Sequence, residues 1–373
     1  MRLLLISANA GAGHIRAAAA LEEAARENFP QVEIRNVDIL SFTDPIYRRA
    51  YANSWLKMAD NAPALWGYIY STSDKAKAKK KQAALVRAFD RLEFRKFRRY
   101  VADYTPDVVI CTHFLPGQIL ATSRKEKWGR FKFGCVLTDF DAHVLWAQPA
   151  FDSFFVGNEE LVEILADKGM EREKISVTGI PIVNAFAQPL ERKAAREKLG
   201  LRGDAPVVLC MGGGMGLGNM DVMVEAVVSM PPVQVLAVAG RNTKLKKDIE
   251  ALKVPRGSEL RVFGFVDNIP EMMAAADFAV SKSGGLSSSE CLAIGLPMLV
   301  PNPSPGQEER NADFLAESGA AFKARGMGSF RHKLGRLLRD EALRAQMAQN
   351  AKRLGKPGAA KAIVQAMLND PRR

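Results

Sequence analysis

Two histidines and an aspartate stand directly after short apolar runs, where a side chain can act on a ligand. His14 follows a glycine turn that ends in Gly13, and His113 and Asp139 follow later runs. If these runs are parallel strands, the three groups meet at the carboxyl edge of one sheet. Imidazole exchanges protons near neutral pH, and a carboxylate can orient it and raise its basicity. The pattern favours His14 as a general base assisted by Asp139, with simple helix capping by His14 as the alternative.

The segment 281–311 has the composition of a nucleotide-binding site. An apolar strand, residues 278–280, leads into a polar turn with two glycines, and we expect a helix over 286–295 that serines in its first turn can cap. Glycines and hydroxyl groups at a helix N-terminus bind anions, and Glu290, one turn further in, can bind a sugar diol. A proline-glycine loop then carries three further polar side chains, Gln307, Glu308 and Asn311. The segment predicts a site for a ribose and a diphosphate.

A second glycine-rich loop follows the apolar run 206–211. Five of the seven residues from 212 to 218 are glycine, among them Gly213 and Gly214, and a helix is expected after them. Backbone N–H groups of such a loop can hold a phosphate. The loop lacks the lysine and hydroxyl residue that close a Walker motif. We favour a phosphate-binding loop over a merely flexible connection.

The elements that must position these groups repeat as strand, glycine turn and helix in both halves of the chain. This pattern predicts two α/β domains, which we place at 1–183 and 184–345. A helix within 346–373 is expected to pack back on the first domain. The first glycine turn lacks the third glycine of a dinucleotide site, so a nicotinamide cofactor is not expected.

Composition and cysteine usage are those of a globular protein in a reducing compartment. The chain has 373 residues, of which 47% are hydrophobic and 25% charged. This is enough for the hydrophobic cores of two domains without stabilising disulfide bonds or metal ions. The four cysteines and four histidines show no metal-ligand spacing, so we expect free thiols and no bound metal. No run approaches the roughly 18 apolar residues of a spanning helix.

The formal charge of +12 is concentrated in one segment. Residues 75–99 hold eleven lysines and arginines against two acidic residues, and aromatic side chains crowd the stretch before them. The segment 44–104 therefore favours contact with an anionic membrane surface. The alternative is a solvated helix whose aromatics pack on their own domain. Nucleic acid is not expected, because no binding motif accompanies the charge. We predict a cytoplasmic protein, held peripherally at the inner face of the cell membrane.

Nearly the whole chain resembles one family of enzymes. The resemblance is carried by residues 11–18, the stretch around Asp139, residues 179–181, residues 240–242 and, most specifically, residues 284–311. These stretches are similar to monogalactosyldiacylglycerol synthases and bacterial processive diacylglycerol glucosyltransferases. They are more distantly similar to the peptidoglycan N-acetylglucosaminyltransferase that makes lipid II. The resemblance implies the GT-B architecture, two facing Rossmann-like domains with the active site in the cleft between them.

The resemblance also implies roles for the two domains. In this family the N-terminal domain takes the lipid acceptor and the C-terminal domain takes the UDP-sugar. His14 matches the family's histidine in the acceptor domain, and Gly13 and His113 are expected on the same acceptor side. Glu290 becomes the ligand of the donor's ribose. The ligands of the donor sugar's hydroxyl groups become Gln307 and Glu308, with Asn311 nearby.

The remainder of the donor site is implied in the same way. Uracil falls against Phe265 and Val266, largely on backbone groups. The residues that fall around the diphosphate are Gly213, Gly214, Lys282, Gly284 and Gly285.

The chain departs from the family at two positions of the donor site. Val183 stands where many relatives carry an arginine that can reach the diphosphate, and Ser283 stands where proline is frequent. Arg241 or Lys282 are the residues that can supply the missing positive charge.

The predicted function is the inverting, metal-independent transfer of glucose or galactose from a UDP-sugar to diacylglycerol or a similar lipid. His14 removes the hydroxyl proton, and the oxygen attacks the anomeric carbon through an oxocarbenium-like transition state. The donor is a substrate, and no cofactor is expected. Two alternatives remain. One is transfer of N-acetylglucosamine to a polyprenyl-linked acceptor, and the other is a non-catalytic UDP-sugar sensor that docks on membranes.

Overall fold

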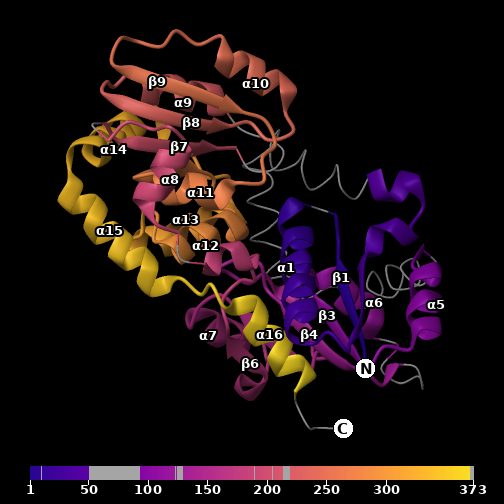
Figure 1. Cartoon of the computed structure of the whole chain (residues 1–373). Helices are drawn as coiled ribbons and strands as arrows, with labels where there is room; N and C mark the ends of the chain where they lie inside the picture. Colours follow the sequence, from indigo (N-terminus) through magenta and orange to yellow (C-terminus); the bar gives the residue numbers. More distant parts are fainter. Residues whose placement is uncertain are drawn as a thin grey trace. The chain divides into compact units, whose positions relative to one another are not determined.

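A computed structural model divides the chain into two compact units. It describes residues 1–9, 11–49, 93–121, 123, 129–188, 190–203, 205–212 and 219–369. The first unit comprises Met1–Asn184, Ser304–Gln307 and Gly358–Arg373, and the second comprises Ala185–Pro303 and Glu308–Pro357. The segment 346–373 is shared between them. Helix α15 (Glu341–Leu354) belongs to the second unit and α16 (Ala359–Leu368) to the first (Figure 1).

The first unit is built on a six-stranded parallel sheet. Its strands are β1 (Arg2–Ser7), β2 (Glu33–Asp38), β3 (Val108–Cys111), β4 (Lys132–Val136), β5 (Ser153–Val156) and β6 (Ile175–Val177). Their order in space is β2-β1-β3-β4-β5-β6, and every neighbouring pair is parallel. Parallel neighbours need crossover connections, so helices must cover the faces of this sheet.

The helices of the first unit lie on both faces of its sheet. They include α1 (Ala12–Asn28), α5 (Arg95–Tyr104), α6 (Phe114–Ala121), α7 (Glu160–Asp167) and α16. Short 3-10 helices are η1 (Ile39–Phe42), η4 (Val144–Trp146) and η5 (Arg172–Lys174), and η6 (Asn184–Ala187) lies at the boundary of the units. Helix α1 is rich in alanine, the best helix former, and α16 packs beside it (Figure 1).

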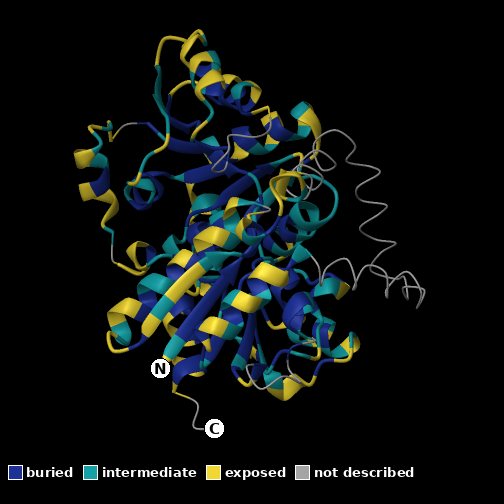
Figure 2. Ribbon diagram, turned by 90° about the vertical axis from the view of Figure 1, so that its right-hand side faces the viewer, coloured by how far each residue is buried: buried dark blue, intermediate teal, exposed yellow. Residues whose placement is uncertain are grey.

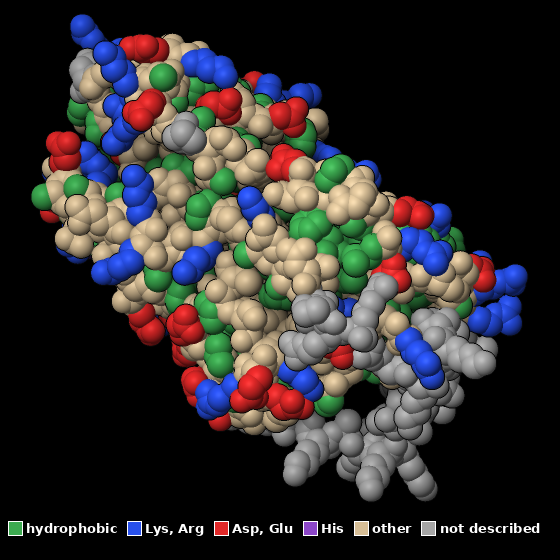
Figure 3. Space-filling model, turned by 60° about the horizontal axis from the view of Figure 1, so that its bottom comes forward, with side chains coloured by type: hydrophobic (Ala, Val, Ile, Leu, Met, Phe, Trp, Pro, Cys, Tyr) green, Lys and Arg blue, Asp and Glu red, His purple; other side chains and the backbone are tan. Residues whose placement is uncertain are grey.

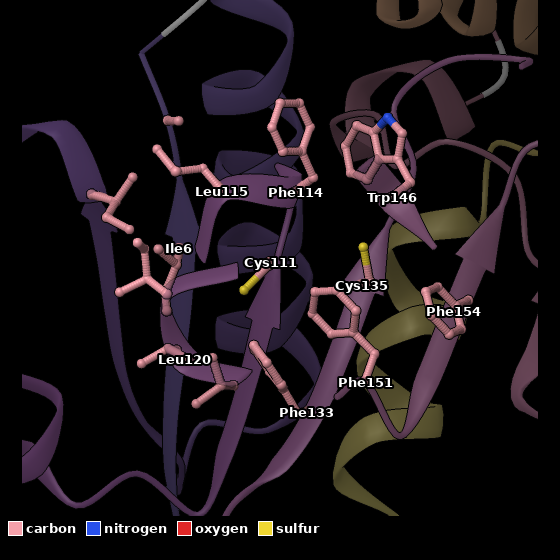
Figure 4. Packing of buried hydrophobic residues seen from close by; sticks show 14 of the residues in the cluster. Ile6, Cys111, Phe114, Leu115, Leu120, Phe133, Cys135, Trp146, Phe151 and Phe154 are labelled. Carbon is pink, nitrogen blue, oxygen red and sulfur yellow. The ribbon is translucent and has the colours of Figure 1, made fainter. Parts of the chain in front are cut away.

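Successive side chains of β1 alternate between the two faces of the sheet, and each face has its own hydrophobic cluster. Leu3 and Leu5 belong to a cluster with Ile363 of α16, whereas Leu4 and Ile6 belong to a second cluster that includes aromatic side chains of β4 and β5 (Figure 4). Successive strand residues point to opposite faces, which explains this division. The four inner strands β1, β3, β4 and β5 are almost entirely buried, whereas exposed residues lie on the edge strands β2 and β6 and on the helices and loops (Figure 2).

The second unit repeats this plan. Its strands are β7 (Val207–Met211), β8 (Val233–Val238), β9 (Ser258–Phe263), β10 (Phe278–Ser281), β11 (Met298–Pro301) and β12 (Ala321–Ala324). They pair in parallel in the order β12-β11-β10-β7-β8-β9. Besides α15, the helices are α8 (Arg192–Lys198), α9 (Met220–Val228), α10 (Thr243–Glu250), α11 (Ile269–Ala275), α12 (Gly285–Ile294), α13 (Gln307–Glu317) and α14 (Gly326–Arg339). Two parallel α/β units confirm the predicted fold class.

Two local expectations for the segment 281–311 are wrong. Gly284 is the N-cap of α12 and no side chain caps the helix, so the serines lie within it. Helix α13 begins at Gln307, so the polar residues expected in a loop lie in its first turns. Gly306, with φ of 98°, turns the chain just before the helix. Acidic side chains in the first turn then favour the helix, because they complement its dipole.

Each sheet has one place where the strand order reverses. It lies between β1 and β3 in the first sheet and between β7 and β10 in the second. Ligands of open parallel sheets bind at the carboxyl ends of the strands at such points. His14 and His113 follow β1 and β3, and Gly212 and Lys282 follow β7 and β10. The topology therefore places both predicted half-sites where such folds hold ligands.

Charged side chains of both signs cover the surface that the structure describes. On the face in Figure 3, Lys and Arg side chains lie among those of Asp and Glu, with apolar side chains between them. Within the described ranges, no helix has the length and the apolar content needed to cross a membrane.

Candidate active site

His14 lies in the first turn of α1 and contacts residues at two further strand ends. Its Nδ1 is 2.8 Å from the backbone oxygen of Thr112, directly after β3, and 3.0 Å from Oγ1 of Thr138, just after β4. Thr112 Oγ1 donates in return to the backbone carbonyl of His14 at 2.8 Å. One half-buried imidazole therefore joins the carboxyl ends of β1, β3 and β4.

The Thr112 carbonyl fixes the tautomer of His14. A carbonyl oxygen can only accept a hydrogen bond, so Nδ1 must carry the proton. The Thr138 hydroxyl oxygen, beside the same N–H, then also accepts. The lone pair of the neutral ring is consequently on Nε2, and a neutral imidazole nitrogen of this kind is a proton acceptor.

Burial keeps His14 neutral. It lowers the pKa of His14 from 6.5 to about 4, and the hydrogen bond to the Thr112 carbonyl offsets part of this effect. At pH 7 the ring is therefore in the form that can take up a proton. Its protonated form is costly in this environment, so a proton accepted during a reaction will be released readily afterwards.

A second neutral histidine packs against the first. The rings of His14 and His113 meet edge to face, with centroids 4.6 Å apart. His113 Nδ1 accepts a hydrogen bond from the Leu115 N–H at 3.0 Å, and burial followed by the proximity of His14 holds the pKa of His113 well below its usual range. The Trp146 ring lies 6.3 Å from that of His14. These rings restrict rotation of the His14 imidazole.

Asp139 accepts a hydrogen bond from Gln307, a residue that the resemblance implied as a ligand of the donor sugar. Its Oδ2 accepts from Nε2 of Gln307 at 3.0 Å, and both residues belong to the first unit. The atom of His14 that a supporting carboxylate would bind is Nδ1, which is bonded to Thr112 and Thr138. Those two partners are neutral oxygens, so assistance of His14 by Asp139 stays a prediction.

In the second unit, the carboxyl end of β10 gathers groups suited to a diphosphate. Gly284 precedes α12 and Gly285 is its first residue, so the N–H groups of the first helical turn are not used within the helix. They carry the positive end of the helix dipole. Lys282 adds a cation just before this turn, and Glu290, 2% exposed, lies within the same helix.

The start of α13 is tied to this turn by side chains. Ser283 Oγ donates to the Glu308 carbonyl at 2.5 Å, and Asn311 Nδ2 donates to the Ser283 carbonyl at 2.9 Å. Lys282 Nζ lies 3.5 Å from Glu308 Oε1. Ser283 and Asn311 are buried. The structure thus brings the predicted diphosphate turn and the predicted sugar-binding helix together, through contacts that the sequence did not predict.

Arg241 and Phe265 form an exposed pair beyond β8 and β9. The Arg241 guanidinium carbon is 5.0 Å from the centroid of the Phe265 ring, which is a cation–π contact. Phe265 is 60% exposed, and Val266 follows it. An exposed ring at this place is accessible to a nucleobase. Gly213 and Gly214 lie outside the described residues.

The predicted membrane segment 44–104 is described only in part, because residues 50–92 lie outside the described residues. In α5, Phe97 and Val101 are buried in the core of the first unit. The basic residues exposed on this helix include Arg95, Lys96 and Arg99. The apolar face of α5 therefore packs on its own domain, as the alternative interpretation held, and the outer face presents positive charge.

Sequence reasoning did not single out Thr112 and Thr138. Each directly precedes a residue that was singled out, His113 or Asp139. The feature of the sequence that could have identified them is a threonine at a strand end next to a histidine or an aspartate. This signal is weak, because threonine is frequent in strands for packing reasons alone.

Comparison with known proteins decides the family. Residues 14–182 match the family model "Monogalactosyldiacylglycerol (MGDG) synthase", and residues 191–354 match "Glycosyl transferases group 1". A processive diacylglycerol beta-glucosyltransferase of Bacillus cereus is 30% identical over 371 residues, which cover 98% of this chain and 93% of that protein. The chain belongs to this family of glycosyltransferases. The resemblance inferred from the motifs is confirmed.

Solved structures agree on the fold of this glycosyltransferase. MurG of Acinetobacter baumannii matches with a TM-score of 0.63 at 14% identity, over 99% of each chain. The UDP-GlcNAc 2-epimerase of Neisseria meningitidis matches with a TM-score of 0.60 at 14% identity, over 99% of this chain and 100% of that one. These matches confirm the GT-B fold. Because the fold also occurs in an epimerase, the family assignment rests on sequence and not on fold.

Proposed function

We propose that the protein transfers a hexose from a UDP-sugar to the free hydroxyl group of diacylglycerol, with inversion at the anomeric carbon. Membership of a diacylglycerol glycosyltransferase family supports the substrates. The observation that carries the chemistry is the state of His14. Its Nδ1–H is bonded to two oxygens, so a neutral ring offers Nε2 as the base.

The reaction balances with His14 as the proton acceptor. The lipid hydroxyl gives its proton to Nε2 while its oxygen bonds to the anomeric carbon. The bond from that carbon to the β-phosphate oxygen breaks, and its electron pair leaves with UDP. Attack opposite the leaving group inverts the configuration through an oxocarbenium-like transition state. The N-terminus of α12 and Lys282 stabilise the charge that develops on UDP.

The remaining residues of the donor site keep the roles that the resemblance implies. Glu290 binds the ribose, and Phe265 with Val266 holds the uracil. Three residues of α13 bind or support the sugar, Gln307, Glu308 and Asn311. The residues proposed around the diphosphate are Gly213, Gly214, Arg241, Lys282, Gly284 and Gly285. The hydrogen bonds between Ser283 and α13 support this arrangement, because they couple the diphosphate turn to the sugar-binding helix.

We assign acceptor binding to residues 1–183, with Gly13 and His113 beside the base, and donor binding to residues 184–345. We further propose that the first domain docks on an anionic membrane surface through the segment 44–104. The exposed basic face of α5 supports this proposal, because each lysine or arginine near an anionic surface contributes about 1 kcal/mol. Docking would place His14 within reach of a lipid hydroxyl.

The test of the base is His14→Ala in a vesicle assay with diacylglycerol and a radiolabelled UDP-sugar. Loss of a general base lowers turnover by about 100- to 10,000-fold, whereas affinity for UDP should remain. His332→Ala is the matched control, because His332 is exposed on α14 and outside the proposed site. Turnover of His14→Ala within a few-fold of the parent would refute the base assignment.

The same assay separates the alternatives. Vesicles with diacylglycerol or with a polyprenyl-linked acceptor are each supplied with UDP-glucose, UDP-galactose and UDP-N-acetylglucosamine. We expect glycolipid from diacylglycerol with one of the two hexose donors. Product only from N-acetylglucosamine and the polyprenyl acceptor would identify the other transferase. Binding of donor and vesicles without product in any arm would identify a sensor.

A further inference from the structure

Thr138 is the residue of the site whose hydroxyl group lies beside the base. It is 3% exposed, and its Oγ1 is 3.0 Å from His14 Nδ1. We propose that Thr138 is a positioning residue for the transfer reaction, which holds the His14 ring with Nδ1 protonated and stabilises the imidazolium as it forms. This inference rests on the proposed role of His14 as the base.

The proton of Nδ1 lies between two acceptors. The Thr112 carbonyl requires that proton to be present, because the other tautomer would direct a nitrogen lone pair at a carbonyl oxygen. The Thr138 oxygen must then accept from the same N–H. Two acceptors on one N–H hold the ring plane more firmly than one, and Nε2 is thereby aimed away from both threonines.

The second acceptor matters most when His14 is charged. Taking a proton on Nε2 makes the Nδ1–H group cationic, and hydrogen bonds to a cationic donor are about twice as strong as neutral ones. Burial disfavours this cation strongly, as the lowered pKa of His14 shows. The partners of Nδ1 are neutral, whereas a Ser-His-Asp triad supplies a carboxylate at this position. The hydrogen bond to Thr138 therefore stabilises the protonated ring of His14 more than the neutral ring.

Thr112 completes the arrangement from the opposite side. Its hydroxyl group donates to the backbone carbonyl of His14 at 2.8 Å, while its carbonyl accepts from the ring of the same residue. The first turn of α1 is thus tied to the end of β3 through the backbone, and Thr138 ties the ring to the end of β4. Because the Thr112 carbonyl cannot be removed by substitution, Thr138 is the residue through which this arrangement can be tested.

The test compares Thr138→Val, which removes the hydroxyl at nearly constant volume, with Thr138→Ser, which keeps it. We expect Thr138→Val to lower kcat by about 10- to 100-fold, with the donor KM within about two-fold, because it loses a hydrogen bond to a charged group. Thr138→Ser should retain most of the activity. The matched control is Thr43→Val, since Thr43 is buried like Thr138 and its hydroxyl group makes a hydrogen bond away from the site, donating to the Leu40 carbonyl at 2.7 Å.

Two measurements distinguish a loss of His14 positioning from a non-specific loss of activity. Loss of an acceptor lowers the pKa of His14, so the acid limb of kcat/KM in Thr138→Val should move to lower pH. In a His14→Gln background, Thr138→Val should cause no further loss of activity. An unchanged acid limb, a kcat equal to that of the parent, or an additive loss in the double variant would overturn the proposal.

A spectroscopic arm separates this proposal from the proposed function. The chain has four histidines, so ¹⁵N spectra of histidine-labelled protein can be assigned with His14→Gln. We expect His14 in the Nδ1–H tautomer near neutral pH, with increased exchange between tautomers or ring orientations in Thr138→Val. An Nε2–H tautomer in the parent protein would overturn the proposal even if transfer occurs. The expected tautomer in a protein without transferase activity would refute the proposed function, and with it the role of Thr138 in transfer, whereas the contact between Thr138 and His14 would stand.

Discussion

At the scale of single residues, the site depends on keeping two adjacent histidines neutral. Burial is the main cause of the lowered pKa at both His14 and His113, and the proximity of His14 adds to it at His113. Their ring centroids are 4.6 Å apart, so a proton on either ring would raise the cost of protonating the other. The pair is therefore a source of acid sensitivity.

This arrangement predicts how stability depends on pH. The folded pKa of His14 is about 4, below the 6.5 of an unfolded chain, so between these values the unfolded state binds the extra proton. Stability is unaffected above pH 6.5 and falls as the pH drops toward 4, by roughly 2 kcal/mol at pH 5. His14→Gln should lose less stability than the parent between pH 7 and pH 5 in denaturant titrations.

The control for this effect is His332→Gln, because His332 is exposed on α14 and lies outside the histidine pair. Equal pH dependence of His14→Gln and the parent would contradict the neutral assignment of His14.

At the scale of elements, α12 is the helix on which the proposed donor half-site is built. Gly295 ends it with φ of 78°, a conformation that favours glycine, and Gly284 begins it without a side-chain cap. The helix also packs against α15. A Cβ atom added at Gly355, the C-cap of α15, would meet the backbone oxygen of Leu292 in α12 at 2.5 Å. The position of α12 therefore depends on a glycine about 60 residues later in the chain.

We expect Gly355→Ala to displace α12. A new methyl group against backbone cannot be accommodated by a rotamer change, and overpacking of this kind costs about 1–3 kcal/mol. Both the stability of the second unit and the affinity for UDP should fall, as measured by hydrogen exchange and calorimetry. Gly358→Ala is the matched control, because nothing lies within 4 Å of its added Cβ. Identical UDP affinity in the two variants would show that α12 tolerates the contact.

Elements were easier to predict than contacts. The helix expected over 286–295 ends within one residue of α12, whose C-cap is Gly295, because glycine acts locally. The first residues of α13 were expected in a loop because proline and glycine precede them, but the acidic first turn favours the helix. The partners of His14 could not be predicted, since Thr112 and Thr138 reach it only through the pairing of strands far apart in sequence.

At the scale of the whole molecule, the chain does not finish one unit before it starts the other. It leaves the first unit after Asn184 and contributes the short segment Ser304–Gln307 to that unit. From Gly358 onward it belongs to the first unit again. The returning helix α16 supplies Ile363, Val364 and Met367 to the core of the first unit. Lys132 Nζ donates to the Ala366 carbonyl near the end of this helix at 2.7 Å. Helix α16 is therefore part of the first unit's core and not an appendage.

This predicts that Met367→Ala will destabilise the first unit selectively. Met367 is 1% exposed, and truncation of a buried methionine costs about 2–5 kcal/mol. Hydrogen exchange should accelerate in β1 and α1, while β7 and β8 keep the protection of the parent. Gln365→Ala provides the control, because Gln365 is exposed on the same helix. Equal acceleration in both units would indicate that they unfold as one.

The return of α16 also sets an order of events on the ribosome. Translation completes every strand and helix of the second unit before it reaches α16. Until then, the side of the first sheet that carries Leu3 and Leu5 is covered by α1 but lacks α16, and a nascent chain exposes apolar surface there. The first unit is thus completed after the second, and a premature stop before residue 359 leaves the proposed base without a finished domain.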